Sequence, residues 1–367
     1  MALEVVVNFE CFLFLMWMYL ASAEIPVTGS QIISKPNCPN HCRNVSIPYP
    51  FGIGAGCFLD KWFEISCVKS LLNSTKPELY RHSFNGKKKR GHGYNVSSIS
   101  ILDGQMTTEV YIARNCPGSE TPMYDSTAGL GKFTFSNTKN KFIGMGCNTW
   151  AYLGQDNRAS IGSGCLSVCN KTEDIINGSC TGVGCCEAAV PAGLKMLNMR
   201  AGSMFKPYES LSFNPCSYGF LIEEKSFKFS TSYLMDFKSN GTGSVPVVVD
   251  WTVGNKTCHE AKKNSTSYAC GPHTDCIVPA GNKTRGYRCK CKKGYAGNPY
   301  LSTTGGCQDV DECKEVCMGP GANCENAEGS YNCTCNKGYK LNDDKSGCIP
   351  ESHDQSTQNN RLIKIVI

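Results

Sequence analysis

Oxygen-bearing side chains gather around two cysteines near the C-terminal end of the chain. Asp309 and Glu312 precede Cys313, and Asn326 follows Cys324. Calcium is a hard cation that takes about six to eight oxygen ligands from carboxylates, amide oxygens and carbonyls. These side chains supply oxygen atoms of the kind that calcium takes, so we consider a calcium site here. The alternative is a loop that keeps the pattern without binding the ion.

A run of four consecutive cations is the second feature with clear chemistry. The run comprises Lys87, Lys88, Lys89 and Arg90. Arginine grips a carboxylate through two parallel hydrogen bonds and lysine adds point charge, so the run suits a polyanion. The rings of Tyr94, Trp62 or Tyr49 are candidates for stacking on a ligand. The alternative is a solvated loop without a specific partner, which is common for charge runs.

The positive charge is concentrated in the N-terminal half. Residues 24–257 hold 23 Lys and Arg against 17 Asp and Glu, whereas residues 258–348 hold 12 against 10. An anionic partner is therefore expected to meet the N-terminal half.

Cysteines are unusually frequent in this chain. There are 25, and 24 remain when Cys11 is set aside, so complete pairing in an oxidising compartment is expected. Twelve of them form two consecutive groups of six. The first group is Cys258, Cys270, Cys276, Cys289, Cys291 and Cys307, and the second is Cys313, Cys317, Cys324, Cys333, Cys335 and Cys348. Spacing alone leaves fifteen connectivities open for each group.

Each group of six resembles an epidermal growth factor-like (EGF-like) module. The resemblance implies bonds from first to third, second to fourth and fifth to sixth cysteine, which are Cys258–Cys276, Cys270–Cys289, Cys291–Cys307, Cys313–Cys324, Cys317–Cys333 and Cys335–Cys348. The second module is similar to the calcium-binding form, because its acids precede its first cysteine. That form implies ligation by the side chains of Asp309, Glu312 and Asn326 and the carbonyls of Val310, Ala327 and Ser330. Asp311 is expected to orient the loop, and the first module is expected to bind no calcium.

A second resemblance lies at the other end of the chain. Two cysteine pairs flank the segment Ile47-Pro48-Tyr49-Pro50-Phe51-Gly52. This pattern resembles the galacturonan-binding domain of plant wall-associated receptor kinases. That family usually has glycine, which tolerates a positive φ, where this chain has Arg43. Residues 160–250 are similar to the cysteine-rich region that follows in the same family. Its neighbours Cys185 and Cys186 are expected to bond to different segments, because a vicinal disulfide strains the peptide between them.

The family resemblance implies binding of cell-wall pectin or its oligogalacturonides. In full-length members a membrane span and a cytoplasmic Ser/Thr kinase follow, whereas this chain has none of the kinase signatures, so we predict that it is not an enzyme. The glycine-rich Gly52-Ile53-Gly54-Ala55-Gly56 lacks the lysine of a phosphate-binding loop, which argues against a nucleotide. The rival hypothesis is a decoy, co-receptor or interaction module whose EGF-like repeats bind a secreted or membrane protein.

The apolar residues before Ala23 indicate a signal peptide, so we expect a secreted or cell-surface protein. Ten Asn-x-Ser/Thr sites agree with that location and disfavour nucleic acid as a partner. They are Asn44, Asn73, Asn95, Asn170, Asn177, Asn240, Asn255, Asn264, Asn282 and Asn332.

Long helical periodicity is scarce, and short alternating segments predict strands. They are Thr107–Ile112, Phe133–Phe135, Ser226–Ser230 and Val245–Val253. The predicted fold class is all-β and disulfide-rich, with little helix. The expected parts are a signal peptide (1–23), a galacturonan-binding domain (24–155), a cysteine-rich region (156–257), EGF-like module 1 (258–308), calcium-binding EGF-like module 2 (309–348), and a polar stalk with the start of a membrane segment (349–367).

Overall fold

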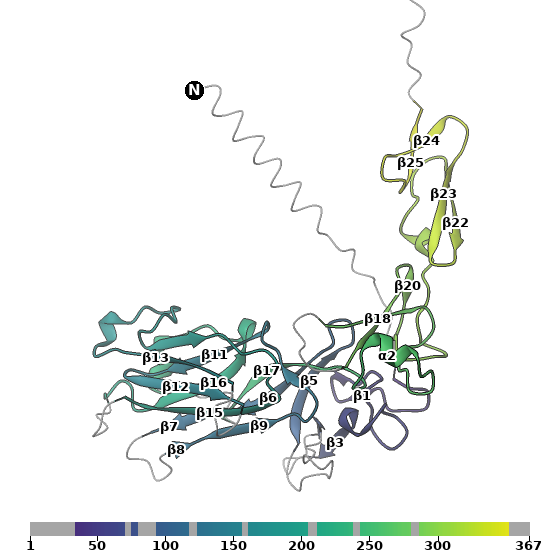
Figure 1. Cartoon of the computed structure of the whole chain (residues 1–367). Coiled ribbons are helices and arrows are strands. Elements are labelled where there is room, and N and C mark those ends of the chain that lie inside the picture. The colour runs from purple at the N-terminus through teal and green to yellow at the C-terminus, as the bar shows by residue number, and fades with distance from the viewer. Residues whose placement is uncertain are drawn as a thin grey trace, which may run out of the picture. The chain divides into compact units, whose positions relative to one another are not determined.

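The structure is a computed structural model of the chain. It describes residues 34–69, 75–79, 93–116, 123–155, 161–204, 211–237, 243–279 and 286–351. Strands dominate these residues and helices are short, which confirms the all-β, disulfide-rich class (Figure 1). None of the helices in this part of the chain is long and apolar enough to cross a membrane.

The N-terminal residues contribute to a six-stranded antiparallel sheet. Its order is β10 (Thr134–Phe135), β17 (Ser244–Asp250), β6 (Gln105–Tyr111), β5 (Tyr94–Ser100), β4 (Thr75–Leu79) and β3 (Ile65–Lys69). In β6 the alternating residues Met106, Thr108 and Val110 are buried, as the period of a strand requires. The predicted strands at 107–112, 133–135 and 245–253 correspond to β6, β10 and β17.

Two further sheets pack face to face. One runs β14 (Cys185–Ala188), β11 (Asn140–Met145), β16 (Ser217–Glu223), β7 (Ala113–Asn115) and β8 (Met123–Tyr124), and the other runs β13 (Gly162–Ser167), β12 (Thr149–Gly154), β15 (Met196–Ser203) and β9 (Ser126–Gly129). A side chain at Gly144 would come within 2.7 Å of the Ala151 side chain, and one at Gly219 within 3.2 Å of the Ala201 side chain. The glycines therefore let the two sheets approach closely.

The predicted strand at residues 226–230 is wrong. Residues Glu224–Ser226 form the 3₁₀ turn η3, and a second turn, η4, covers Thr231–Leu234. The alternation that suggested a strand has another cause, because Phe227 packs edge-on against Phe220 of β16 with ring centroids 5.5 Å apart. The segment is thus held by side-chain packing.

Strands and disulfides join residues from either side of the expected division between residues 155 and 156. Strand β17 pairs with β6 and β10, β14 pairs with β11, and β15 pairs with β9. Cys116–Cys216 and Cys147–Cys169 also join residues from either side of the expected boundary. The two predicted parts therefore share their sheets.

The other disulfides before residue 258 are Cys38–Cys57, Cys42–Cys67, Cys165–Cys186 and Cys180–Cys185. The neighbours Cys185 and Cys186 thus bond to different segments, as predicted. The hairpin of β1 (His41–Cys42) and β2 (Val45–Ser46) turns at Arg43, whose φ is +54°. Arginine here adopts the left-handed conformation that glycine takes more easily.

The EGF-like modules consist of short elements. Module 1 contains α2 (Cys258–Lys262), β18 (Thr274–Ile277), β19 (Arg288–Cys291) and β20 (Tyr295–Ala296), and β20 pairs with β21 (Gln308–Asp309). Module 2 contains η5 (Glu312–Lys314), β22 (Ala322–Ala327), β23 (Ser330–Cys335), β24 (Tyr339–Leu341) and β25 (Cys348–Pro350). Their six disulfides follow the first-to-third, second-to-fourth, fifth-to-sixth order that the resemblance implies.

A cluster of buried aromatic rings joins distant parts of the chain. Phe51 makes edge-on contacts with Phe63 and Trp251, at centroid distances of 5.0 and 5.4 Å, and Phe63 contacts Phe133 at 5.4 Å. The ring centroid of Tyr300 in module 1 lies 5.8 Å from that of Trp251. Phe51, from the Tyr-Pro-Phe-Gly segment, is therefore a core residue.

The remaining short elements are η1 (Lys61–Phe63) and η2 (Thr172–Asp174).

Candidate functional site

Asp309 and Asn326 lie in contact at the start of module 2. The Asn326 side-chain N–H donates to Asp309 Oδ2 across 2.8 Å, and the backbone N–H of Gly329 donates to Asp309 Oδ1. Asp309 belongs to β21 and Asn326 to β22, so the fold joins residues 17 positions apart. An oxygen-rich corner results from this contact.

Glu312 lies in η5, and the Cys313–Cys324 disulfide ties that turn to β22. The Oε2 atom of Glu312 is buried and has no hydrogen-bond partner among the described residues. A buried carboxylate oxygen without a partner is costly, and a bound cation removes that cost. The residues present therefore fit a calcium ion.

The carbonyl candidates lie in the same corner. The Val310 carbonyl accepts from Glu312 N–H at 3.1 Å, and Ala327 and Ser330 are opposed residues at the end of the β22–β23 hairpin. Asp311 faces Lys314 instead, with 3.4 Å between its Oδ2 and the lysine Nζ. Within the described residues no group of three or more His, Cys, Asp or Glu side chains is arranged to hold a metal. The candidate site instead combines two carboxylates with amide and carbonyl oxygens, the mixture that calcium prefers.

The joint between the two modules lies beside this corner, and the sequence analysis missed it. Tyr295 of module 1 packs its ring on Gly329, where a side chain would come within 2.9 Å of the ring. Its hydroxyl donates to Glu328 Oε1 at 3.1 Å, and the His273 ring stacks on the Tyr295 ring with 4.5 Å between the ring centroids. Since Tyr295 also pairs with Asp309, the candidate ligand is part of the joint. The available signal was Tyr295 itself, an aromatic residue between the fifth and sixth cysteines of module 1.

The basic run Lys87, Lys88, Lys89 and Arg90 lies outside the described residues. The strands on either side of it are described. Leu79, the last residue of β4, pairs with Tyr94, the first residue of β5, and Ile65 of β3 pairs with Leu79. The Gly93 N–H also donates to Glu78 at 2.9 Å. The two strand ends that flank the run in the sequence are therefore neighbours in the sheet.

The three candidate stacking rings differ in accessibility. Tyr94 is 8% exposed, and its hydroxyl oxygen accepts from Gly129 N–H at 2.7 Å, so its proposed stacking role is wrong. Burial raises the pKa of Tyr49, and its carbonyl accepts a 2.6 Å hydrogen bond from Asn298 of module 1. Trp62 is half-buried and lies in η1, three residues before the start of β3. It is the most suitable of the three.

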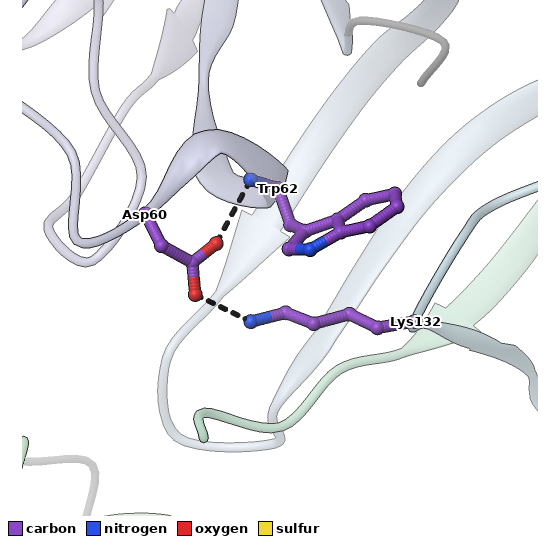
Figure 2. Close-up of polar contacts among 3 residues, drawn as sticks. All are labelled: Asp60, Trp62 and Lys132. Atoms are coloured by element: carbon purple, nitrogen blue, oxygen red, sulfur yellow. Dashed lines mark hydrogen bonds and ion pairs between the residues drawn. The ribbon is translucent and has the colours of Figure 1, made fainter. Parts of the chain in front are cut away.

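Figure 2 shows how the chain holds Trp62. Asp60 Oδ1 accepts from the Trp62 backbone N–H at 2.8 Å, while Asp60 Oδ2 lies 2.8 Å from Lys132 Nζ. The Lys132 ammonium also lies 4.3 Å from the centroid of the Phe63 ring. Burial lowers the pKa of Lys132, and the Asp60 carboxylate opposes this effect. Lys132 was not singled out in the sequence because it lies far from Trp62 along the chain.

Seven of the ten candidate glycosylation sites lie in the described residues. Six of them are exposed, namely Asn44, Asn170, Asn177, Asn255, Asn264 and Asn332. Asn95 is half-buried, and its side-chain N–H donates to Glu109 at 3.0 Å. The sites at Asn73, Asn240 and Asn282 lie outside the described residues. The structure therefore leaves six sites open to modification.

Two family models match the chain. Residues 38–110 match "Wall-associated receptor kinase galacturonan-binding", and residues 309–348 match "Calcium-binding EGF domain". Both describe binding domains. The second match covers the corner formed by Asp309, Glu312 and Asn326.

Curated relatives agree with these matches. Wall-associated receptor kinase 2 of Arabidopsis thaliana is 34% identical over 88% of this chain and 41% of its own length. Wall-associated receptor kinase 5 of the same plant is 33% identical over 92% of this chain and 43% of its own length. The chain thus spans less than half the length of these relatives. From these matches and the strand-rich, disulfide-bonded fold, we conclude that the chain is a wall-associated receptor kinase-like ectodomain.

Proposed function

We propose that this chain is an extracellular binding protein for de-esterified pectin, which it contacts through the basic run Lys87–Arg90. The observation that carries the proposal is the match of residues 38–110 to the galacturonan-binding family, because the run lies inside it. Oligogalacturonides carry one carboxylate per sugar. Four successive cations between two paired strands suit such a repeating anion.

The distribution of charge supports the same surface. Residues 24–257 carry a net charge of +6, from 23 bases and 17 acids, and residues 258–348 carry +2, from 12 bases and 10 acids. Attraction of a polyanion to exposed cations is screened by salt. The proposed binding therefore weakens with ionic strength, whereas a protein interface with an apolar core persists.

Calcium has a separate role in the proposal. Asp309, Glu312 and Asn326 bind the ion with the carbonyls of Val310, Ala327 and Ser330, and the ion supplies charge neutralisation at this corner. Asp309 pairs with Tyr295 of module 1 and contacts Asn326 of module 2. Fixing Asp309 stiffens the joint between the modules.

The chain acts by binding and not by catalysis in this proposal. Twelve disulfides join described cysteines, which suits an oxidising extracellular location. The second candidate is a decoy, co-receptor or interaction module whose EGF-like modules bind a secreted or membrane protein. The contacts between Tyr295 and Glu328 favour it in one respect, because they present the two modules as one joined surface.

Binding of the glycosylated chain to de-esterified oligogalacturonides tests the proposal. Calorimetric titrations at low and at physiological salt compare the unchanged chain with a variant in which Lys87, Lys88, Lys89 and Arg90 are alanine. In the matched control, four exposed lysines of module 1 are replaced by alanine, so that the same number of positive charges is removed from another part of the chain. They are Lys262, Lys263, Lys292 and Lys293. We expect salt-sensitive binding that only the first variant loses.

Two results would contradict the proposal. Equal loss in both variants would mean that net charge alone attracts the ligand. No binding by a folded, unchanged chain would favour the protein-interaction candidate. Each titration is repeated after calcium removal by chelation, since calcium also bridges galacturonate chains directly.

A further inference from the structure

We propose that Trp62 and Lys61 form a subsite for a single galacturonate residue, in which the indole stacks on the sugar and the ammonium pairs with its carboxylate. This inference rests on the proposed function and names where one sugar of the polymer is held. It concerns described residues only, and the basic run forms no part of it.

Gly131 leaves room for the Trp62 ring on one side, because glycine has no side chain. A Cβ atom there would lie 1.9 Å from Cζ3 of the indole, and the glycine has a φ of +66°. No other residue at this position permits the ring to lie where it does. The ring therefore rests directly on the backbone of the loop between β9 and β10.

Asp60 and Lys132 hold the backbone that carries the ring. Asp60 accepts from the Trp62 backbone N–H and pairs with Lys132, both at 2.8 Å (Figure 2). The Lys132 side chain is 20% exposed, so this contact lies largely away from water. A ring held in place before the ligand arrives loses little freedom on binding, which favours affinity.

Lys61 supplies the charge that a uronate requires. It is exposed, and its Nζ lies over the Trp62 ring, 5.5 Å from the ring centroid, so the flexible side chain must move aside when a sugar stacks there. The apolar C–H face of a sugar suits an aromatic ring, while the carboxylate at its edge suits a neighbouring ammonium. Lys132 is not available for this role because Asp60 already neutralises it. A neutral sugar would have the stacking contact without the ion pair.

The subsite lies at a definite end of the six-stranded sheet. Trp62 precedes Ile65, the first residue of β3, by three positions, and Ile65, Leu79 and Tyr94 pair in series across β3, β4 and β5. A sugar on Trp62 would thus lie close to the strand ends at which Ile65, Leu79 and Tyr94 pair.

Fluorescence titration with de-esterified oligogalacturonide tests the subsite. The chain has four tryptophans, and Trp150 offers a matched control because it is also half-buried and packs over a glycine, Gly202. We expect Trp62→Ala to raise the Kd about tenfold, and Lys61→Gln to raise it several-fold. Trp150→Phe should leave the Kd unchanged. The ligand-induced fluorescence change should disappear in Trp62→Phe and persist in Trp150→Phe.

The ester form of the ligand separates the two contacts. Fully methyl-esterified oligogalacturonide has the same ring and no charge, so Lys61→Gln should not alter its residual binding, whereas Trp62→Ala should still weaken it. Lys61 is exposed, and its substitution therefore tests the subsite even if Trp62→Ala fails to fold. If the unchanged chain binds no oligogalacturonide, the proposed function fails together with the subsite. If it binds, and Lys61→Gln and Trp62→Phe behave like the unchanged chain, the subsite is wrong and the proposed function stands.

Discussion

The Lys132 ammonium lies 2.8 Å from the Asp60 carboxylate, and this ion pair joins the galacturonan-binding match to a loop beyond its end. Asp60 lies within residues 38–110, while Lys132 follows β9. The aromatic core also joins the matched segment to later parts of the chain, because Phe51 and Phe63 pack on Phe133 and Trp251. The matched segment therefore completes its core with residues from elsewhere in the chain.

A fragment of residues 34–110 should not fold by itself. It keeps Cys38–Cys57 and Cys42–Cys67 but loses Phe133, Trp251 and the β17 partner of β6. Burial of these rings drives the packing, and their removal exposes Phe51 and Phe63 to water. Near-ultraviolet circular dichroism and thermal melting of the fragment and of residues 24–351 check this. A cooperative melt of the short fragment would show that the segment is an independent domain.

Loss of the Cys116–Cys216 bond should destabilise the chain more than loss of Cys180–Cys185. The first spans 100 residues and the second five. The chain-entropy relation gives about 4.7 kcal/mol for the long loop and about 2 kcal/mol for the short one. Urea unfolding of the two double cysteine-to-serine variants measures the difference. Equal destabilisation would mean that loop closure does not determine the contribution of these bonds.

Replacing Asn298 by alanine should weaken the contact of module 1 with the segment around Tyr49. The side chain is fully buried, donates to the Tyr49 carbonyl at 2.6 Å and accepts from Tyr300 N–H at 3.0 Å. Leaving these two backbone groups unpaired should cost about 2 kcal/mol. Thermal unfolding measures the loss, with Asn323→Ala as the exposed control, for which a change below about 0.5 kcal/mol is expected. Similar effects of the two substitutions would argue against a structural role for Asn298.

Glu312→Gln should weaken calcium binding at least tenfold. The substitution removes the charge from a carboxylate whose Oε2 is buried without a partner, whereas Asp311→Asn alters a residue already paired with Lys314. Calcium affinity depends on the number of charged ligands, so Asp311→Asn should change it by less than about threefold. Calorimetric titration with calcium measures the affinity of both variants.

Limited proteolysis near the Tyr295–Asp309 joint should be faster after calcium is removed by chelation. Equal cleavage rates with and without calcium would contradict the stiffening role.

Alkaline pH should destabilise the fold through Tyr300. Burial raises the pKa of this phenol well above its ordinary value of 10.0, and the opposing effect of the Cys289 N–H is smaller. In the unfolded chain the hydroxyl loses its proton near pH 10.0, whereas the folded chain retains it, so stability is present below that pH and falls above it. Urea unfolding at about pH 9, 10 and 11 should show a shallower fall for Tyr300→Phe. Parallel curves for the two proteins would mean that other groups cause the alkaline loss.

Local patterns in the sequence were sufficient for several features. The order of cysteines in residues 258–348 and the acids before Cys313 pointed to two EGF-like modules, the second with a calcium corner, and the 309–348 match agrees. The adjacency of Cys185 and Cys186 was enough to predict separate partners. These inferences succeed because the relevant residues lie close together along the chain. The alternation in residues 226–230 led to a wrong strand prediction, because local alternation does not distinguish a paired strand from a segment whose side chains pack on Phe220.

Tertiary structure alone decided which distant residues meet. The pairing of Cys116 with Cys216, the sharing of sheets across residue 155, the burial of Tyr94 and the contact of Trp62 with Gly131 all depend on strands that are far apart in sequence. The sequence by itself determined the class of protein, its two EGF-like modules and the chemistry available to it. The fold determined which cations and rings share a surface, because contacts between distant strands leave no periodic signal in the chain.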